Sequence, residues 1–276
     1  MSFKRLKNSK NISIINYHFV REKPSINKIK LNALTKKLFI NQLDFISEKY
    51  NFISAKDCIS TIYNKKDLPP NPVLLTFDDG YIDHYKTVFP LLVDRSITGC
   101  FFPVAKVIKE RKMLEVNKIQ LIIGSTKINL LINDLRQLIN ENKSIYDLND
   151  FEFYRNNISY KHPYDSKDVI FVKNLLQISL KPKIRNFFID FLFKKYVTSN
   201  EKGICEELYL SFDQIRTMKD NGMYFGSHGY SHQWLNQLNY EEQKFEILNS
   251  INFLKDIKVN KNELMISYPF GGYNKS

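Results

Sequence analysis

Short apolar runs, rich in β-branched and aromatic residues, occur along the first and the last third of the chain. Runs of this length between turn-forming residues are typical of buried strands. Between some of them, apolar residues recur three or four positions apart, which is the spacing of one helix face. We therefore expect strands at 12–20, 72–79, 98–104, 224–229 and 264–270, and helices that include 39–50 and 247–254.

The best-marked helix begins after Ser211, because Ser211 and Gln214 have the spacing of a capping box. It ends near Gly222, a residue that suits the left-handed conformation just after a helix. Strands that alternate with helices predict βαβ units and a mostly parallel sheet or barrel.

The alternation of strands and helices stops over residues 106–210, where the sequence pattern predicts mostly helix and few strands. The clearest helical segments there are 130–142 and 168–196. We interpret 106–210 as a helical insertion within a single domain of residues 1–276, in the role of a lid or a partner-binding surface.

The composition is that of a folded protein and indicates the compartment in which it works. The chain has 276 residues, of which 43% are hydrophobic, so a substantial core is expected. No run of about 18 apolar residues is present, which argues against a membrane-spanning helix. The basic start lacks a long apolar stretch, and the odd number of widely spaced cysteines, Cys58, Cys100 and Cys205, favours a reducing compartment. The expected location is the cytoplasm.

The formal net charge of +12, from 41 basic and 29 acidic residues, leaves two explanations open. One is an anionic partner, such as a membrane surface touched peripherally or an anionic glycan carrier. The other is a general bias toward lysine along the whole chain. No compact Arg-rich run or nucleic-acid signature accompanies the charge, so a nucleic-acid partner is not expected.

The densest chemical signal is the run TFDDGY at 76–81, which ends the second predicted strand. Carboxylates at the carboxyl end of a buried strand lie where α/β folds place their sites. Because neighbouring strand residues point opposite ways, a bend at Gly80 is needed before Asp78 and Asp79 can serve one pocket. The alternative is an Asp-Gly turn in which Asp79 caps the next helix.

A second signal, HGYSH at 228–232, follows another apolar segment. His228 and His232 are four residues apart, a spacing that can chelate one cation from one face of a helical turn. Neutral imidazoles suit zinc and similar metals, and one carboxylate completes a three-ligand site with open positions. Asp79 is the candidate carboxylate. The alternative for either histidine is a local capping or packing role.

Two weaker signals come from the ends of the chain. His18 lies in the apolar run IINYHFV at 14–20, where a histidine is more often part of the core than catalytic. The segment ISYPFGGYN at 266–274 predicts a strand that ends in a Pro/Gly turn and shapes the rim of a pocket.

In this order the segments resemble the motifs of the polysaccharide deacetylase family (carbohydrate esterase family 4, with the NodB-homology domain). TFDDG matches the first motif directly, and HGYSH matches H-[ST]-x-x-H in both histidines, with Gly229 in place of Ser or Thr. YPFG at 268–271 is similar to the third motif, with Ser267 where many members have Arg.

Tyr17-His18 resembles the N-terminal element of the circularly permuted poly-N-acetylglucosamine deacetylase branch, in which the acid histidine precedes the other motifs. The chain ends at Ser276 without the C-terminal histidine segment of the usual members. The resemblance covers 11–104 and 208–276. It implies a distorted (β/α) barrel of the polysaccharide deacetylase type, open or incomplete, with the helical insertion.

The resemblance implies hydrolysis of N-acetyl groups on an amino-sugar glycan or a carrier-linked precursor. Asp79, His228 and His232 would hold a divalent metal. Zinc is the expected ion, with cobalt or nickel as alternatives. Such an ion polarises the amide carbonyl and lowers the pKa of bound water.

The resemblance also assigns the remaining roles. Asp78 would be the general base and His18 the general acid that protonates the departing amine. Tyr81, Tyr268 and Phe270 would contact the substrate or its oxyanion.

Two other functions stay open. One is a catalytically inactive carbohydrate-binding protein on the same fold. The other is a non-haem iron oxygenase, because its facial triad also has two histidines and a carboxylate. Those enzymes usually sit on a double-stranded β fold with an H-x-D pair, which this sequence lacks.

Overall fold

The computed structural model divides the chain into two compact units. The first comprises Met1–Pro24, Asn32–Lys112 and Ile204–Ser276, and the second comprises Ser25–Leu31 and Met113–Gly203. The residues that the structure describes are 11–23, 25–26, 29–63, 67–260 and 263–273.

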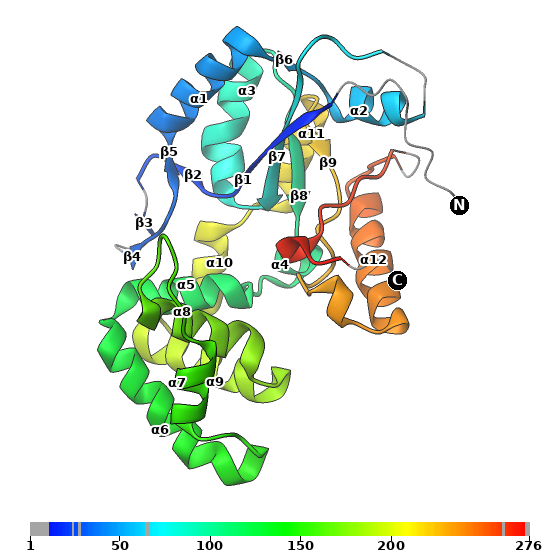
Figure 1. Ribbon diagram of the computed structural model, residues 1–276. Coiled ribbons are helices and arrows are strands. Elements are labelled where there is room, and N and C mark those ends of the chain that lie inside the picture. Colours follow the sequence, from blue (N-terminus) through cyan, green and yellow to red (C-terminus); the bar gives the residue numbers. More distant parts are fainter. Residues whose placement is uncertain (1–10, 24, 27–28, 64–66, 261–262, 274–276) are drawn as a thin grey trace. The chain divides into compact units, whose positions relative to one another are not determined.

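A parallel sheet forms the centre of the first unit (Figure 1). The strand order is β1-β7-β8-β9, and β6 also pairs with β7. Within the described residues the sheet stays open and does not close into a barrel. Its strands are β1 (Ser13–Tyr17), β6 (Asn51–Phe52), β7 (Pro72–Asp79), β8 (Cys100–Pro103) and β9 (Tyr224–Phe225).

Strand β7 is buried at every residue, as expected of the central strand of a parallel sheet that is covered on both faces. Its bounds match the predicted strand at 72–79. One face carries Phe77, which continues an aromatic row across the sheet. In that row neighbouring ring centroids are 4.8–5.5 Å apart, and the members are Tyr17, Phe77, Phe101 and Phe225.

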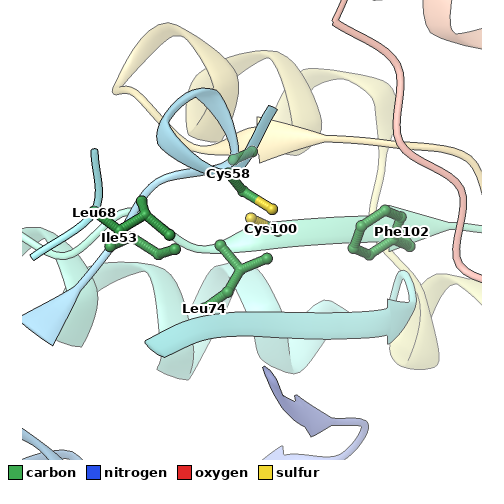
Figure 2. Packing of buried hydrophobic residues seen from close by; sticks show 7 residues of the cluster. Ile53, Cys58, Leu68, Leu74, Cys100 and Phe102 are labelled. Carbon is green, nitrogen blue, oxygen red and sulfur yellow. The ribbon is translucent and has the colours of Figure 1, made fainter. Parts of the chain in front are cut away.

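The opposite face of the sheet carries a cluster of buried apolar residues. Leu74 on β7 packs there with Cys100 and Phe102 on β8, as Figure 2 shows. The same cluster includes Ile53, Ala55, Cys58 and Leu68. Because side chains alternate along a strand, Asp78 lies on this face of β7, two residues beyond Thr76.

Helices cover both faces of this sheet (Figure 1). Phe39 of α1 packs on the ring of Phe77, whereas Cys58 of α2 belongs to the cluster on the opposite face. The helices of this unit are α1 (Lys36–Lys49), α2 (Ala55–Ile62), α3 (Phe89–Asp94), α4 (Ala105–Glu110), α11 (Phe212–Asp220) and α12 (Tyr240–Asp256), and α10 (Glu201–Leu208) lies mostly within it. Short helical turns are η1 (His84–Val88), η3 (Leu235–Gln237) and η4 (Pro269–Gly271).

The predicted start and end of α11 are confirmed. Ser211 accepts a hydrogen bond from the Gln214 backbone N–H, and the Gln214 side chain accepts one from the Ser211 N–H. Gly222 follows the helix in the left-handed conformation, with φ of +87°. This is the capping pattern that the spacing of Ser211, Gln214 and Gly222 predicts.

Three predicted strands differ from the structure. The one at 224–229 is shorter, because β9 ends at Phe225 and Ser227 beyond it forms only an isolated bridge. The run at 12–20 divides into β1 and β2 (Val20–Arg21), because β2 pairs instead with β5 (Leu34–Thr35). The predicted strand at 264–270 was wrong: within it only Ile266 bridges another residue, Ser227, and the chain then turns into η4. A strand cannot continue there because Pro269 lacks the backbone N–H that pairing with a neighbouring strand needs, and because Phe270 has a left-handed φ of +57°.

The second unit is mainly helical, and the predicted helix at 130–142 is present. The predicted segment at 168–196 is helical as well, but it is interrupted at residues 180–181, just before Pro182 begins a new helix. Helices α5 and α9 pack together, and buried Lys118 is held by ion pairs of 2.8 and 2.9 Å with Asp190 and Glu201. The elements are β3 (Ser25–Ile26), β4 (Ile29–Lys30), α5 (Glu115–Ser125), α6 (Ile128–Tyr146), α7 (Phe151–Ile158), α8 (Lys167–Asn174), η2 (Leu175–Ser179) and α9 (Pro182–Tyr196). A single domain with an insertion at 106–210 stays a prediction.

None of the helices in the described residues is long and apolar enough to cross a membrane. The expectation that the chain begins without a leader peptide concerns residues 1–10, which lie outside the described part.

Gly80 offers a test of the backbone turn that ends β7. It has φ of +73°, and a Cβ there would lie 2.7 Å from Pro103 Cβ and 3.0 Å from Pro103 Cα. We expect Gly80→Ala to lower the free energy of unfolding by about 2–4 kcal/mol, from left-handed strain plus overpacking. Urea unfolding measures this loss.

Gly222→Ala is the matched control, because Gly222 has φ of +87° but no atom within 4 Å of an added Cβ. It should cost only about 1–2 kcal/mol, the strain alone. Equal losses in the two variants would contradict the tight packing of Gly80 against Pro103.

Candidate functional site

The site is built at the end of β7, where two consecutive residues adopt the left-handed conformation. Asp79 has φ of +72° and Gly80 has φ of +73°. The bend that we expected at Gly80 therefore begins one residue earlier. Left-handed backbone is uncommon outside glycine but is tolerated by aspartate. The turn changes the direction of the Asp79 side chain, so that Asp78 and Asp79 can both contribute to one site.

The structure brings the three predicted ligands together. Asp79 Oδ1 lies 3.5 Å from His228 Nε2 and 3.3 Å from His232 Nε2. One ligand atom from each residue lies within 4.8 Å of the other two. Asp79 Oδ1 is buried and has no hydrogen-bond partner among the described residues. Burying such an oxygen without a partner is costly unless a cation occupies the site.

The electrostatics of the three groups suit a cation between them. Burial alone would raise the pKa of Asp79, but the adjacent imidazoles of His228 and His232 lower it well below its usual range. Burial lowers the pKa of His232 to about 4, so this ring is neutral near pH 7. Burial opposes the charged form of His228 as well, but Asp79 and Asp78 outweigh it and raise its pKa. A bound cation would replace the proton that these acceptors attract.

Surrounding groups hold the ligands in a binding orientation. His228 Nδ1 lies 2.8 Å from the carbonyl oxygen of Ser267. Because a carbonyl only accepts, Nδ1 carries a hydrogen, and in the neutral ring the lone pair is on Nε2, on the side of Asp79. The Tyr81 hydroxyl donates to Asp79 Oδ2 at 2.7 Å, which leaves Oδ1 for a ligand bond.

The prediction for Tyr81 was a contact with the substrate or its oxyanion, and the structure places the residue differently. The side chain is 1% exposed and stacks between Phe19 and Tyr209. It therefore suits holding Asp79 rather than contacting a substrate.

Asp78 occupies the other face of the strand end. Its Oδ2 accepts hydrogen bonds from Asn16 Nδ2 at 2.9 Å and from Ser267 Oγ at 3.1 Å. Thr76 Oγ1 donates to Asn16 Oδ1 at 3.1 Å and so fixes the amide. Asp78 Oδ1 is buried without a hydrogen-bond partner among the described residues. Two neutral donors thus hold one carboxylate oxygen and leave the other available to accept a proton.

Neither donor to Asp78 was predicted from the sequence. Asn16 lies next to Thr76 in the β1–β7 register, and this pairing is set by the fold rather than by a local pattern. Ser267 was noted only as the residue where many relatives have Arg. Its carbonyl and hydroxyl join His228 to Asp78.

His18 follows the end of β1, and the side chain of His84 holds its backbone. Its carbonyl oxygen lies 2.9 Å from Nε2 of the fully buried His84. Beside it, Phe19 stacks on Tyr81 with ring centroids 3.8 Å apart. The His18 side chain is exposed, and electrostatic interactions link it to Asp79.

Asp83 forms an ion pair of 2.9 Å with Arg21. The side chains are 5% and 12% exposed. This pair joins the chain just after His18 to the segment that follows Asp78 and Asp79.

The third motif forms an exposed rim beside the ligands. Phe270 is 40% exposed, and its ring centroid lies 4.5 Å from those of His232 and Trp234. The Trp234 and Phe270 rings are nearly parallel, at 6°. Tyr268 is 47% exposed. Trp234 thus packs under the rim, and the outer surface of the rim is aromatic.

Known proteins resemble this chain in sequence pattern and in fold. The sequence model of the polysaccharide deacetylase family matches residues 65–131 and 163–276. No curated protein matches the chain. Among solved structures, the Streptococcus pyogenes deacetylase PplD, in complex with acetate, is 19% identical with a TM-score of 0.55. That match covers 96% of this chain and 76% of PplD.

Two further structures have TM-scores of 0.50, and each match covers 96% of this chain. IcaB from Ammonifex degensii is 17% identical over 79% of its own chain. A de-N-acetylase from Aggregatibacter actinomycetemcomitans is 16% identical over 81% of its chain. At these identities the similarity shows a shared fold, which confirms the predicted fold class.

His84 makes the stability of the metal-free protein depend on pH. Burial lowers its pKa to about 4, from 6.5 in the unfolded chain. Between these values the unfolded chain binds more protons, so stability falls as the pH falls through this window. From pH 7.5 to pH 5, His84 should remove about 2 kcal/mol of the free energy of unfolding.

Urea unfolding of the wild type and of His84→Gln at both pH values isolates this effect. Glutamine keeps a donor for the His18 carbonyl but does not titrate. The other histidines titrate in both proteins and cancel in the comparison. The same pH dependence in the two proteins would show that His84 is not the group responsible.

Proposed function

Because the chain belongs to the polysaccharide deacetylase family, we propose that it is a metal-dependent carbohydrate N-deacetylase. Membership of the family makes it a hydrolase of the deacetylase class, as predicted. One observation carries the proposed metal dependence: Asp79 Oδ1 is buried, has no hydrogen-bond partner among the described residues and lies against the Nε2 atoms of His228 and His232. The proposed substrate is an N-acetylated amino-sugar glycan.

Asp79, His228 and His232 would hold the ion. Two imidazoles and one carboxylate are a donor set that suits zinc and leaves positions for water and substrate. Cobalt and nickel accept the same donors. A divalent ion there supplies a Lewis acid for the amide carbonyl and lowers the pKa of the attacking water.

Asp78 is the proposed general base. Asn16 and Ser267 donate to Oδ2, so Oδ1 is the atom that receives the proton of the water. Burial of Asp78, which is 5% exposed, keeps bulk water from competing for that oxygen. Restraint of one oxygen also holds the other in one direction, which general base catalysis requires.

His18 is the proposed general acid. An amine leaves as a strong base, so protonation of its nitrogen has to accompany cleavage of the C–N bond. In the sheet, Tyr17 pairs with Phe77, and β1 therefore ends beside the carboxylates at the end of β7. This pairing supports the resemblance to the permuted branch, in which the acid comes from the N-terminal segment.

The exposed rim is the proposed contact surface for the sugar. The Phe270 ring and Tyr268 offer apolar faces of the kind on which sugar rings pack. The backbone N–H of Phe270 is the proposed oxyanion donor, and its left-handed conformation sets the direction of that N–H.

No feature of the described residues favours either alternative, an iron oxygenase or an inactive carbohydrate-binding protein. The parallel α/β sheet is not the double-stranded β fold on which facial-triad oxygenases usually sit. A binding protein without activity would not need Asp78 with one oxygen held and the other unpartnered. A carrier-linked precursor as substrate and a cytoplasmic location stay predictions.

Acetate release from N-acetylglucosamine oligomers tests the proposal. We expect none from metal-stripped protein and recovery with zinc or cobalt. Asp78→Asn and His18→Ala should each lower kcat by about 100- to 10,000-fold, the usual worth of a general base or acid. Lipid-linked and nucleotide-linked amino sugars, assayed in parallel, test the carrier prediction.

Asp213→Asn is the control, because that carboxylate is 92% exposed on α11 and should leave kcat unchanged. Activity that survives metal removal would contradict the metal dependence. An Asp78→Asn variant as fast as the wild type would contradict the assignment of the base.

A further inference from the structure

Glu246 is a buried acid that the proposed mechanism does not use. It lies on α12 and is 3% exposed. Its Oε2 accepts hydrogen bonds from the backbone N–H groups of Tyr230 at 2.9 Å and Ser231 at 2.8 Å. Its Oε1 accepts one from the Ser231 hydroxyl. A buried carboxylate is retained at low cost when such donors surround it.

The donors belong to the three residues that separate His228 from His232. The opposite side of this segment is held by the first turn of α4. Lys106 N–H donates to the carbonyl of Tyr230 at 2.8 Å. The segment is thus bonded through its N–H groups to α12 and through a carbonyl to α4.

The conformation of this segment needs such support. Gly229 has φ of +73° and His232 has φ of +62°, so the chain turns sharply at both ends of the segment. A left-handed residue with a side chain is disfavoured unless its surroundings hold it. A Cβ on Gly229 would lie 3.1 Å from Glu246 Oε2. The carboxylate therefore occupies the space that a side chain at 229 would need.

We propose that Glu246 is a positioning residue for the metal site. By accepting three hydrogen bonds from residues 230–231, it holds the turn between the histidines so that both Nε2 atoms lie against Asp79 Oδ1. Its hydrogen bonds among the described residues go to Tyr230 and Ser231, which lie between the two ligands. This inference rests on the proposed function, because it requires that His228 and His232 bind a metal.

Cobalt binding separates this role from a purely structural one. The affinity for Co²⁺ and the visible spectrum of the cobalt-loaded protein report ligand arrangement without any substrate. Glu246→Leu removes both acceptor oxygens, and with them all three hydrogen bonds. It should weaken Co²⁺ binding roughly ten- to 100-fold, as loss of an outer-shell partner does, and change the spectrum. Glu246→Gln keeps one acceptor oxygen, whose two lone pairs can accept from both backbone N–H groups, and should retain most of the affinity.

Glu241→Leu is the matched control. It removes a carboxylate from the same helix, but its side chain is 75% exposed. It should bind Co²⁺ as the wild type does. A folded Glu246→Leu protein with wild-type affinity and spectrum would overturn the proposal.

If Glu246→Leu does not fold, Glu246→Asp and Ser231→Ala carry the test. Aspartate keeps the charge but withdraws the oxygens by one methylene, and alanine removes one donor. Both should weaken Co²⁺ binding, and wild-type affinity in both would overturn the proposal. Absence of Co²⁺ binding by the wild type is a different result, because it would overturn the metal site of the proposed function and this inference with it.

Discussion

The left-handed turn at Asp79 and Gly80 is the constraint on which the rest of the site depends. In a regular strand the two carboxylates would lie on opposite faces of the sheet. The turn directs Asp79 toward the two histidines, while Asp78 stays on the face that carries Asn16. Gly80 allows this turn only because it has no side chain to meet Pro103. One backbone feature therefore separates the proposed base from the proposed ligand.

The other residues of the site each hold one side chain or backbone segment in place around that turn. Tyr81 holds one oxygen of Asp79, and Ser267 joins the imidazole of His228 to the carboxylate of Asp78. His84 holds the backbone of His18, and Glu246 holds the turn between the histidines. Most of these contacts join residues far apart in sequence. The site is thus preorganised by the packing of several elements around the end of β7, rather than by any one loop.

The sequence predicted the parts that depend on local patterns. The bounds of β7, the capping box at Ser211 and the grouping of Asp79 with two histidines all follow from spacing and strand composition. Tertiary context decided the rest. Asn16 is identifiable only from its pairing with β7, and Glu246 looks like any acid on an amphipathic helix. The predicted strand at 264–270 fails because proline and a left-handed residue turn the chain there.

The central claim is that Asp79, His228 and His232 together bind one metal ion. An anomalous difference map, recorded at the zinc absorption edge from crystals of the zinc-loaded protein, tests it most directly. The account predicts a single strong peak within bonding distance of Asp79 Oδ1, His228 Nε2 and His232 Nε2, at about 2.0–2.2 Å from each. A zinc peak elsewhere on the chain, with none among these three atoms, would contradict it.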